Sequence, residues 1–264
     1  GLVWNPLPGP RKQRAIVLQR PCGTPVGAAE ASHPDTAAEG WGNYGFQSGD
    51  FNGDGKADVA WNHRGALNKT YVAVSTGSGW TFAAAQQRPE GGWTPYQWFV
   101  LDTDGDGDDD LVFNQLGATN RTYVNFSNGD GTFDMSQTYY EPAPGGWSAY
   151  AAFVGEIDNN ARQDLIFNTV GPNTGNWTYT GRFNAGGRTY TLSSAQQHFT
   201  PCCWQAYQRI TGDFNGDGRT DLFWSSAVNS GGRALHGGLA NGSGGWTYLN
   251  PYLAIPLESG GGFT

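Results

Sequence analysis

The sequence predicts an all-β protein, a β-propeller of four-stranded blades. An acidic loop occurs four times, beginning at residues 50, 102, 156 and 213, so the copies are 52, 54 and 57 residues apart, and three of the four contain Gly. Each loop is followed by a short run of β-branched and aromatic residues, which indicates a buried strand. The composition, with 41 Gly, 11 Trp and 12 Tyr and few Lys and Glu, suits strands and turns.

The strands of one unit follow in a constant order. The strand after the loop ends in an aromatic and a polar residue, as in Trp61-Asn62 and Phe113-Asn114. A turn leads to a run such as NKTYVAVSTG, and then to a shorter run such as WTFAAAQQ. A turn such as GGWTPY and a strand such as QWFVLD lead into the next loop. Four strands in about 53 residues are typical of a propeller blade. A β-sandwich, the alternative, does not require such regular copies.

The copies predict a single propeller domain over residues 1–264, with repeats at about 1–40, 41–92, 93–146, 147–203 and 204–264. GLVWN at the start matches the strand after a loop, as in DLVFN, and GGF at 261–263 matches the beginning of a further GGW turn. We therefore expect about five blades, four complete and one split between GLVWN at the start and the segment around Leu253 to Phe263. The alternative is a piece of a longer propeller.

The loops predict a site for a hard divalent cation. Three copies have oxygen-bearing side chains at positions 1, 3, 5 and 9 and Gly at position 6, which favours calcium. Unlike a helix-flanked calcium loop, they lack Glu at position 12 and lead into a strand. Acidic turns without metal are the alternative. With position 7 included, the predicted metal-site residues are Asp50, Asn52, Asp54, Lys56, Asp58, Asp102, Asp104, Asp106, Asp108, Asp110, Asp213, Asn215, Asp217, Arg219 and Asp221.

The third loop departs from this pattern. Glu156 stands at position 1, Asn160 at position 5, and Ala161 replaces the Gly that permits a left-handed backbone. We therefore expect three Ca2+ ions, with a weaker fourth site formed by Glu156, Asp158, Asn160 and Asp164.

Loops of this kind in blade-length units resemble the FG-GAP/VCBS repeat family, whose calcium-binding blades occur in integrin-α-type propellers. The resemblance covers almost the whole chain, and it implies calcium held by loop oxygens between the first two strands of a blade. The recurring GGW turn is similar to that of calcium-containing propeller lectins of the Psathyrella velutina type, which bind N-acetylglucosamine and sialic acid between blades. Cys202-Cys203 replaces the two Gly residues in one unit. This second resemblance implies a lectin without fixing its sugar.

A Trp recurs three residues before a Tyr in four units. The C–H face of a sugar packs on an indole while its hydroxyls bind polar neighbours, so these pairs are candidate glycan sites. The alternative is that one Trp per unit fills the contact between neighbouring blades. The predicted carbohydrate-binding residues are Trp41, Tyr44, Trp93, Tyr96, Trp147, Tyr150, Trp204 and Tyr207.

Charge and composition restrict the function further. Of the 23 acidic residues, 15 lie in the four loops, so the net charge of -8 is local, and the lack of a basic run argues against nucleic acid. No apolar stretch approaches the length of a membrane-spanning helix. The carboxylates outside the loops form no obvious acid–base pair, although distant carboxylates can meet in a fold. We therefore predict a non-catalytic protein.

The main interpretation is a secreted, calcium-stabilised propeller lectin whose partners are glycans or glycoproteins. A protein-binding adhesion or toxin-associated module is the first alternative, and a polysaccharide-active enzyme is the second. Cys22 is expected either to bridge to Cys202 or Cys203 or to remain a thiol. Asn68, Asn120 and Asn176 begin Asn-x-Thr triplets, interpreted first as turn residues before a strand. The sequence does not determine the oligomeric state.

Overall fold

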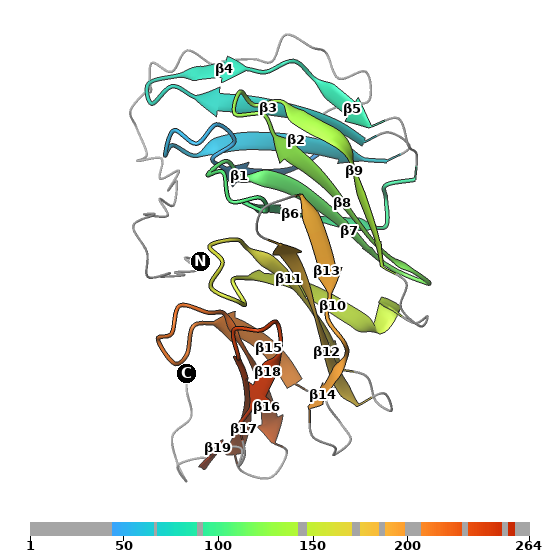
Figure 1. Ribbon diagram of the computed structural model, residues 1–264, viewed down its shortest axis with the longest axis vertical. Helices are drawn as coiled ribbons and strands as arrows, with labels where there is room; N and C mark the ends of the chain where they lie inside the picture. The colour runs from blue at the N-terminus through green and yellow to red at the C-terminus, as the bar shows by residue number, and fades with distance from the viewer. Residues whose placement is uncertain are drawn as a thin grey trace, which may run out of the picture. The chain divides into compact units, whose positions relative to one another are not determined.

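A computed structural model describes residues 44–65, 68–88, 92–141, 147–170, 175–184, 188–198, 207–228, 232–249 and 253–256. The N-terminal strand-like segment GLVWN, the three cysteines, Trp41, Trp204 and the predicted closing blade from residue 257 onward lie outside these residues. Within the described residues, the strands form four antiparallel sheets, each with four strands in sequence order (Figure 1). This is the blade topology that the sequence predicts.

The first two sheets contain strands β1 to β9. The first has the order β1-β2-β3-β4 with β5 also paired to β3, and the second has the order β6-β7-β8-β9. A register shift between Val124 and Phe126 interrupts the pairing of the last two strands. The bounds are β1 Tyr44–Gly49, β2 Asp58–Arg64, β3 Asn68–Ser75, β4 Trp80–Phe82, β5 Gln86–Arg88, β6 Tyr96–Leu101, β7 Asp110–Leu116, β8 Asn120–Ser127 and β9 Phe133–Glu141.

The third and fourth sheets repeat the arrangement of the first. Their orders are β10-β11-β12-β13, with β14 on β12, and β15-β16-β17-β18, with β19 on β17. A short 3-10 turn, η2 (Trp147–Ala149), precedes the third sheet. The bounds are β10 Tyr150–Gly155, β11 Asp164–Val170, β12 Asn176–Asn184, β13 Thr189–Leu192, β14 Gln196–His198, β15 Tyr207–Gly212, β16 Asp221–Val228, β17 Gly232–Ala240, β18 Trp246–Tyr248 and β19 Leu253–Pro256.

Strand β19 corrects one expectation about the C-terminal segment. Residues from 253 onward were expected to help complete the split closing blade, but Leu253–Pro256 pairs with β17 inside the fourth sheet. It occupies the place that β5 takes on β3 and β14 takes on β12. The segment therefore belongs to a blade that the repeat had already counted as complete.

The chain divides into two compact units, one built around the first and second sheets and the other around the third and fourth. Within each unit, apolar side chains of the two sheets form one buried cluster. Phe51 of the first acidic loop and Ala60 of the first sheet pack with Leu111 and Phe133 of the second. In the other unit, Ile157 of the third loop and Ile166 of the third sheet pack with Leu222, Trp224 and Trp246 of the fourth. Burial of apolar surface between successive sheets is thus the main stabilising contribution in each unit.

Two Gln side chains add polar contacts between successive sheets. The amide of Gln86 accepts a hydrogen bond from the Phe133 backbone N–H at 2.7 Å and donates one to the Phe133 carbonyl at 3.1 Å. Gln196 accepts a hydrogen bond from the Trp246 backbone N–H at 2.7 Å. Each Gln satisfies backbone groups of the outer strand of the next sheet, which would otherwise lack a sheet partner there.

Candidate metal centres

Each acidic loop joins the first two strands of a sheet and folds around its position 1 carboxylate. Asp50 accepts hydrogen bonds from the backbone N–H groups of Asp54 and Gly55 at 3.1 and 2.7 Å. Asp213 accepts them from Gly216 and Gly218 at 2.7 and 3.0 Å. Asp102 and Glu156 act in the same way in the second and third loops. The predicted strand–loop–strand arrangement is therefore present in all four copies.

The third loop keeps the backbone of the others in spite of its sequence. Gly53 and Gly55 have φ of 65° and 80° in the first loop, and Asn159 and Ala161 have φ of 60° and 65° at the same places in the third. They are the only non-Gly residues with positive φ among the described residues. An Ala in this region costs of order 1–2 kcal/mol. The hydrogen bonds to Glu156 and the packing of the flanking strands thus outweigh the conformational cost.

The position 9 carboxylates connect each loop to the third strand of its sheet. Asp110 accepts hydrogen bonds from the backbone N–H of Thr103 at 2.9 Å and of Ser127 at 2.8 Å. The equivalent residues Asp58, Asp164 and Asp221 accept one from Ser75, Phe183 and Ala240, respectively. All four side chains are fully buried. The sequence predicted an oxygen ligand at position 9, and the structure adds a second role, because each of these carboxylates accepts a backbone hydrogen bond from the third strand of its sheet.

Burial changes the acidity of these carboxylates. Desolvation raises the pKa of Asp110 and of Asp164 to about 8 and that of Asp58 to about 6, despite the hydrogen bonds that lower it. Desolvation also raises the pKa of Asp221. A cation beside a carboxylate favours its ionised form, so cation binding in these loops would oppose the effect of burial.

Two loops gather three carboxylates whose oxygens lie within 4.8 Å of one another. They are Asp102, Asp104 and Asp106 in the second loop and Glu156, Asp158 and Asp164 in the third. Asp158 Oδ1 is buried and has no hydrogen-bond partner in the described part of the chain. Its other oxygen lies 3.5 Å from the guanidinium of Arg182. The third loop was predicted to be the weakest site, yet it is one of the two loops whose carboxylates lie close together. Both groups have the hard oxygen donors that Ca2+ prefers.

The first and fourth loops differ because a basic side chain stands at position 7. The Lys56 ammonium lies 2.5 Å from Asp54 Oδ2, and the Arg219 guanidinium pairs with Asp217. The predicted metal-site residues Lys56 and Arg219 thus contribute cations from their side chains, and only their backbone carbonyls have the chemistry of a calcium ligand. No group of three carboxylates forms in either loop within the residues described.

Neighbouring loops within a unit also contact each other through position 8, which sequence reasoning missed. The Asp109 backbone N–H donates to the Asp50 carbonyl at 2.7 Å, and Asp109 Oδ2 accepts from the Asp50 N–H at 2.7 Å. Thr220 makes the same pair of contacts with Glu156. The sequence signal for this contact is that the second and fourth loops have, at position 8, a side chain that can accept a hydrogen bond.

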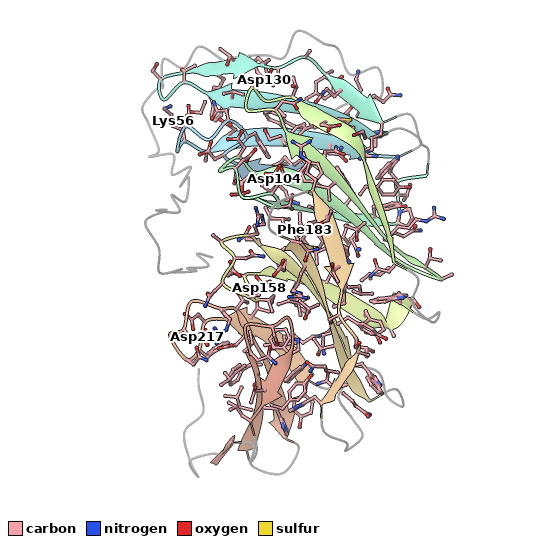
Figure 2. The ribbon with its side chains drawn as sticks, viewed as in Figure 1. Lys56, Asp104, Asp130, Asp158, Phe183 and Asp217 are labelled. Atoms are coloured by element: carbon pink, nitrogen blue, oxygen red, sulfur yellow. The ribbon has the colours of Figure 1, made fainter. Side chains whose placement is uncertain are left out.

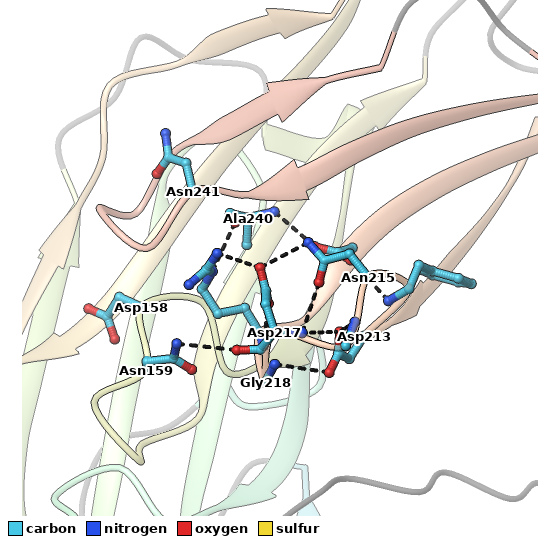
Figure 3. Close-up of polar contacts among 12 residues, drawn as sticks. Asp158, Asn159, Asp213, Asn215, Asp217, Gly218, Ala240 and Asn241 are labelled. Atoms are coloured by element: carbon cyan, nitrogen blue, oxygen red, sulfur yellow. Dashed lines mark hydrogen bonds and ion pairs between the residues drawn. The ribbon is translucent and has the colours of Figure 1, made fainter.

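Further contacts connect the third and fourth loops. The Asn159 side-chain amide donates to the Asp217 carbonyl at 3.4 Å, and Asp217 itself lies among the backbone donors and side chains of its own loop (Figure 3). In the first unit along the chain, Asp108 Oδ1 lies so near Gly53 that a Cβ there would approach it to 2.3 Å. Burial, followed by the nearby carboxylates, raises the pKa of Asp108. Figure 2 shows Asp104, Asp158 and Asp217 on their respective loops.

The two described Trp residues of the predicted carbohydrate-binding pairs, Trp93 and Trp147, are buried in the core. Trp93 and Trp147 are each 1% exposed. Trp93 packs against Tyr96, Phe113 and Tyr123 with ring centroids 4.8, 5.5 and 4.9 Å away. Trp147 makes the same three contacts with Tyr150, Phe167 and Tyr179. Neither indole has a face open to a sugar ring, so the packing alternative holds for these two residues.

The Tyr members of the predicted pairs are more accessible than the Trp members. Tyr44, Tyr150 and Tyr207 are half-buried at the start of the first strand of their sheets, whereas Tyr96 is buried. Each packs against an aromatic ring at the equivalent place on the third strand, with centroid distances of 5.4 to 5.7 Å. Trp41 and Trp204 belong to the part of the chain that is not described.

The three Asn-x-Thr triplets begin strands and do not lie in exposed turns. Asn68, Asn120 and Asn176 are fully buried at the first positions of β3, β8 and β12. The side chain of Asn120 accepts a hydrogen bond from the Asn114 amide at 2.7 Å. A glycan attached to any of these side chains is incompatible with the folded blade.

Comparison with known proteins supports the repeat assignment. Residues 50–113 match the model of the FG-GAP-like repeat family. The matched range extends from the start of the first acidic loop through the second loop into β7. No curated protein matches the chain. Across the residues described here, no helix has the length and apolar character needed to cross a membrane.

Proposed function

Because the chain carries an FG-GAP-like repeat at residues 50–113, we propose that it is a calcium-stabilised β-propeller module that binds a partner and does not catalyse a reaction. The observation that carries this proposal is that three carboxylates gather in the second loop and three in the third. Like charges at such short separation repel, and a bound dication would convert that repulsion into attraction. Asp102, Asp104 and Asp106 would hold one ion, and Glu156, Asp158 and Asp164 another.

Calcium occupancy in the first and fourth loops is a further part of this proposal. There, Asp50, Asn52 and Asp58, and Asp213, Asn215 and Asp221, would hold the ion once Asp54 and Asp217 exchange their basic partners for it. Extracellular calcium modules bind with dissociation constants of about 10⁻⁴–10⁻³ M. Sites in this affinity range would suit a secreted protein, which is the location we propose.

The calcium proposal is tested by calorimetry and thermal unfolding in calcium and in excess chelator. One occupied site adds about 2.7 kcal/mol at a calcium concentration a hundredfold above Kd. Asp158→Asn and Asp104→Asn should each reduce the number of bound ions by one. Asp130→Asn is the matched control, because Asp130 is an exposed acidic residue in a turn outside the loops. An identical melting curve in calcium and chelator would contradict the proposal.

For the partner, we propose a glycan or glycoprotein bound at the half-buried Tyr residues. What supports this is repetition: Tyr44, Tyr150 and Tyr207 occupy one equivalent place in three sheets, and each combines a partly exposed ring with a phenolic hydroxyl. Burial and the neighbouring Tyr179 raise the pKa of Tyr150 to about 12, so its hydroxyl stays a hydrogen-bond donor at neutral pH. Amphipathic rings of this type recur where proteins bind sugars and other polar ligands.

A glycan array probed in the presence of calcium tests this partner. Tyr150→Phe keeps the ring contacts with Trp147 and Tyr179 and removes the hydroxyl with its hydrogen bond to Tyr179, so it should weaken binding and lower the melting temperature only slightly. Tyr190→Phe on β13 is the control, because Tyr190 packs on Phe183 at a different place in the same sheet. Binding of no glycan by calcium-loaded protein would instead favour the protein-binding adhesion module and leave the calcium proposal intact.

A further inference from the structure

Four Asn-Gly pairs lie in described loops and turns of the chain. In such a pair the backbone nitrogen of the Gly can attack the side-chain amide of the Asn, because Gly has no Cβ to hinder the approach. The attack closes a succinimide ring and releases ammonia, which is the route of spontaneous deamidation. The fold around each pair therefore decides how readily it reacts. The pairs are Asn52-Gly53, Asn128-Gly129, Asn215-Gly216 and Asn241-Gly242.

Two of these pairs have the same local sequence. Residues 50–55 and 213–218 both read Asp-Phe-Asn-Gly-Asp-Gly, and both begin an acidic loop with Asn at position 3. The intrinsic reactivity of an Asn-Gly pair depends on its neighbours along the chain. Because those neighbours are identical here, a difference in rate between Asn52 and Asn215 would come from the folded structure.

The fourth loop holds its pair with three hydrogen bonds. The Gly216 N–H donates to Asp213 Oδ1 at 2.7 Å. The Asn215 side chain donates from Nδ2 to Asp217 Oδ2 at 2.9 Å, and its Oδ1 accepts from the Asp217 N–H at 3.0 Å (Figure 3). Attack requires the Gly216 nitrogen to lose the proton that the carboxylate holds. It also requires the Asn215 amide to turn away from Asp217, so all three bonds oppose the reaction.

The first loop restrains its pair less. Asp50 accepts hydrogen bonds from the N–H groups of Asp54 and Gly55, and the Gly53 N–H donates to none of the described residues. Within the same part of the chain, the Asn52 side chain has a single hydrogen bond, in which its Oδ1 accepts from the Asp54 N–H at 3.2 Å. Both the attacking nitrogen and the amide that it attacks are therefore less restrained than in the fourth loop.

The other two pairs lie in turns that restrain them more than the first loop restrains its own. In the turn after β8, the Gly129 N–H donates to Ser127 Oγ at 3.1 Å. In the turn after β17, Asn241 Oδ1 accepts three hydrogen bonds from Ser243 and Gly245, at 2.7 to 3.1 Å. Ring closure in either turn must first break these bonds.

We propose that Asn52 is a site of spontaneous deamidation and that in the folded protein it reacts faster than the same sequence at Asn215. The Gly53 nitrogen gives its proton to solvent and bonds to Asn52 Cγ. The Cγ–Nδ2 bond then breaks, and the side-chain nitrogen takes up a proton and leaves as ammonia. Water opens the succinimide at Cγ to give isoaspartate's isomer, an ordinary aspartate, or at the other carbonyl carbon, that of the backbone, to give each product according to which C–N bond breaks. The net reaction consumes water and releases ammonia, without an oxidant or a reductant.

The modification would change the first acidic loop. Position 3 would gain a negative charge, as the second loop already has in Asp104. The isoaspartate product would also lengthen the backbone by a methylene group between two residues that hold the loop together. Asn52 is thus the position at which the chemistry of a candidate metal centre can change without a mutation.

Peptide mapping by mass spectrometry tests the proposal in the full-length protein, incubated with chelator at mildly alkaline pH, folded and in urea. In urea, Asn52 and Asn215 should deamidate at equal rates. In the folded protein, Asn52 should react roughly tenfold faster, because ring closure there breaks two fewer hydrogen bonds. Asn52→Gln should remove the signal from its peptide, since the longer side chain would have to close a larger ring. Labelling by an isoaspartyl methyltransferase identifies the isoaspartate product.

The exposure of the two side chains makes the outcome decisive. Asn215 is exposed and Asn52 is half-buried, so a rate governed by exposure would have the opposite order. Equal rates in the folded protein, or a faster reaction at Asn215, would overturn the proposal. So would an unmodified Asn52 after a period in which the unfolded chain reacts completely. Because chelator is present throughout, the result does not depend on whether the loops bind calcium.

Discussion

Lowering the pH should destabilise the unit that contains the third and fourth sheets through one buried residue, His198. This residue is fully buried at the end of β14. Its ring stacks on Trp224 at 4.8 Å with an interplanar angle of 13°, and Tyr248 lies 4.3 Å away. The His236 ring is 5.9 Å away. Burial, followed by the charge of His236, lowers the pKa of His198 to about 4.

The size of the effect follows from proton linkage. An unfolded His has a pKa of about 6.5, so between pH 6.5 and 4 the unfolded chain binds a proton that folded His198 excludes. This contribution to stability is complete above pH 6.5 and is lost progressively as the pH falls toward 4. For a folded pKa of about 4, the loss between pH 7 and pH 5 is roughly 2 kcal/mol.

Urea unfolding at pH 7 and pH 5 measures this loss in the wild type and in His198→Phe. The Phe ring keeps an aromatic group between Trp224 and Tyr248 but cannot bind a proton. Carboxylates and His236 titrate in both proteins, so the difference between the two pH dependences isolates His198. The wild type should lose about 2 kcal/mol more than the variant. Equal losses in the two proteins would refute the role assigned to His198.

Three further substitutions test the packing and the loops. Ala161→Gly should stabilise the protein by about 0.5–1 kcal/mol in urea unfolding, because it removes the cost of a left-handed Ala, and the greater entropy of Gly in the unfolded chain offsets only part of that gain; a loss of stability would contradict the strain at this position. Trp147→Ala should cost about 3–5 kcal/mol, since it removes a fully buried side chain, and an unchanged melting temperature would mean that the indole is not part of the core. Gln86→Ala should cost about 1–3 kcal/mol, because the backbone N–H and carbonyl of Phe133 lose their partner; the control is Gln87→Ala on the same strand, an exposed position that should show no comparable loss.

The repeat made the sheets predictable. The loops with their constant spacing, and the apolar run after each, located β2, β7, β11 and β16 directly, because strand period and turn residues are local properties of a sequence. The assignment of β19 failed for a different reason. The first and third units end this part in QQR and QQH, whereas the fourth has Leu253–Pro256, so the match to β5 and β14 is visible only in the pairing with β17.

The sequence predicted which residue types form the candidate metal centres, but not how their side chains and backbone are arranged. Spacing predicted oxygen donors at positions 1, 3, 5 and 9, and the structure places them around each loop. The spacing could not predict that Lys56 and Arg219 pair with the position 5 carboxylates, since the direction of a long side chain depends on its surroundings. Nor could it predict that the third loop would adopt the common backbone with Ala161 at positive φ.

By itself, then, the sequence determined the blade, its strands, and the loops that concentrate negative charge, because all three arise from patterns within about 50 residues. Only the tertiary structure decided which repeated residues are core and which are surface. Trp93 and Trp147 occupy a repeated position that fits a glycan platform as well as a packing contact, and the adjoining strands enclose both indoles. Burial depends on the neighbours that folding brings together, and a single unit of the repeat does not contain those neighbours.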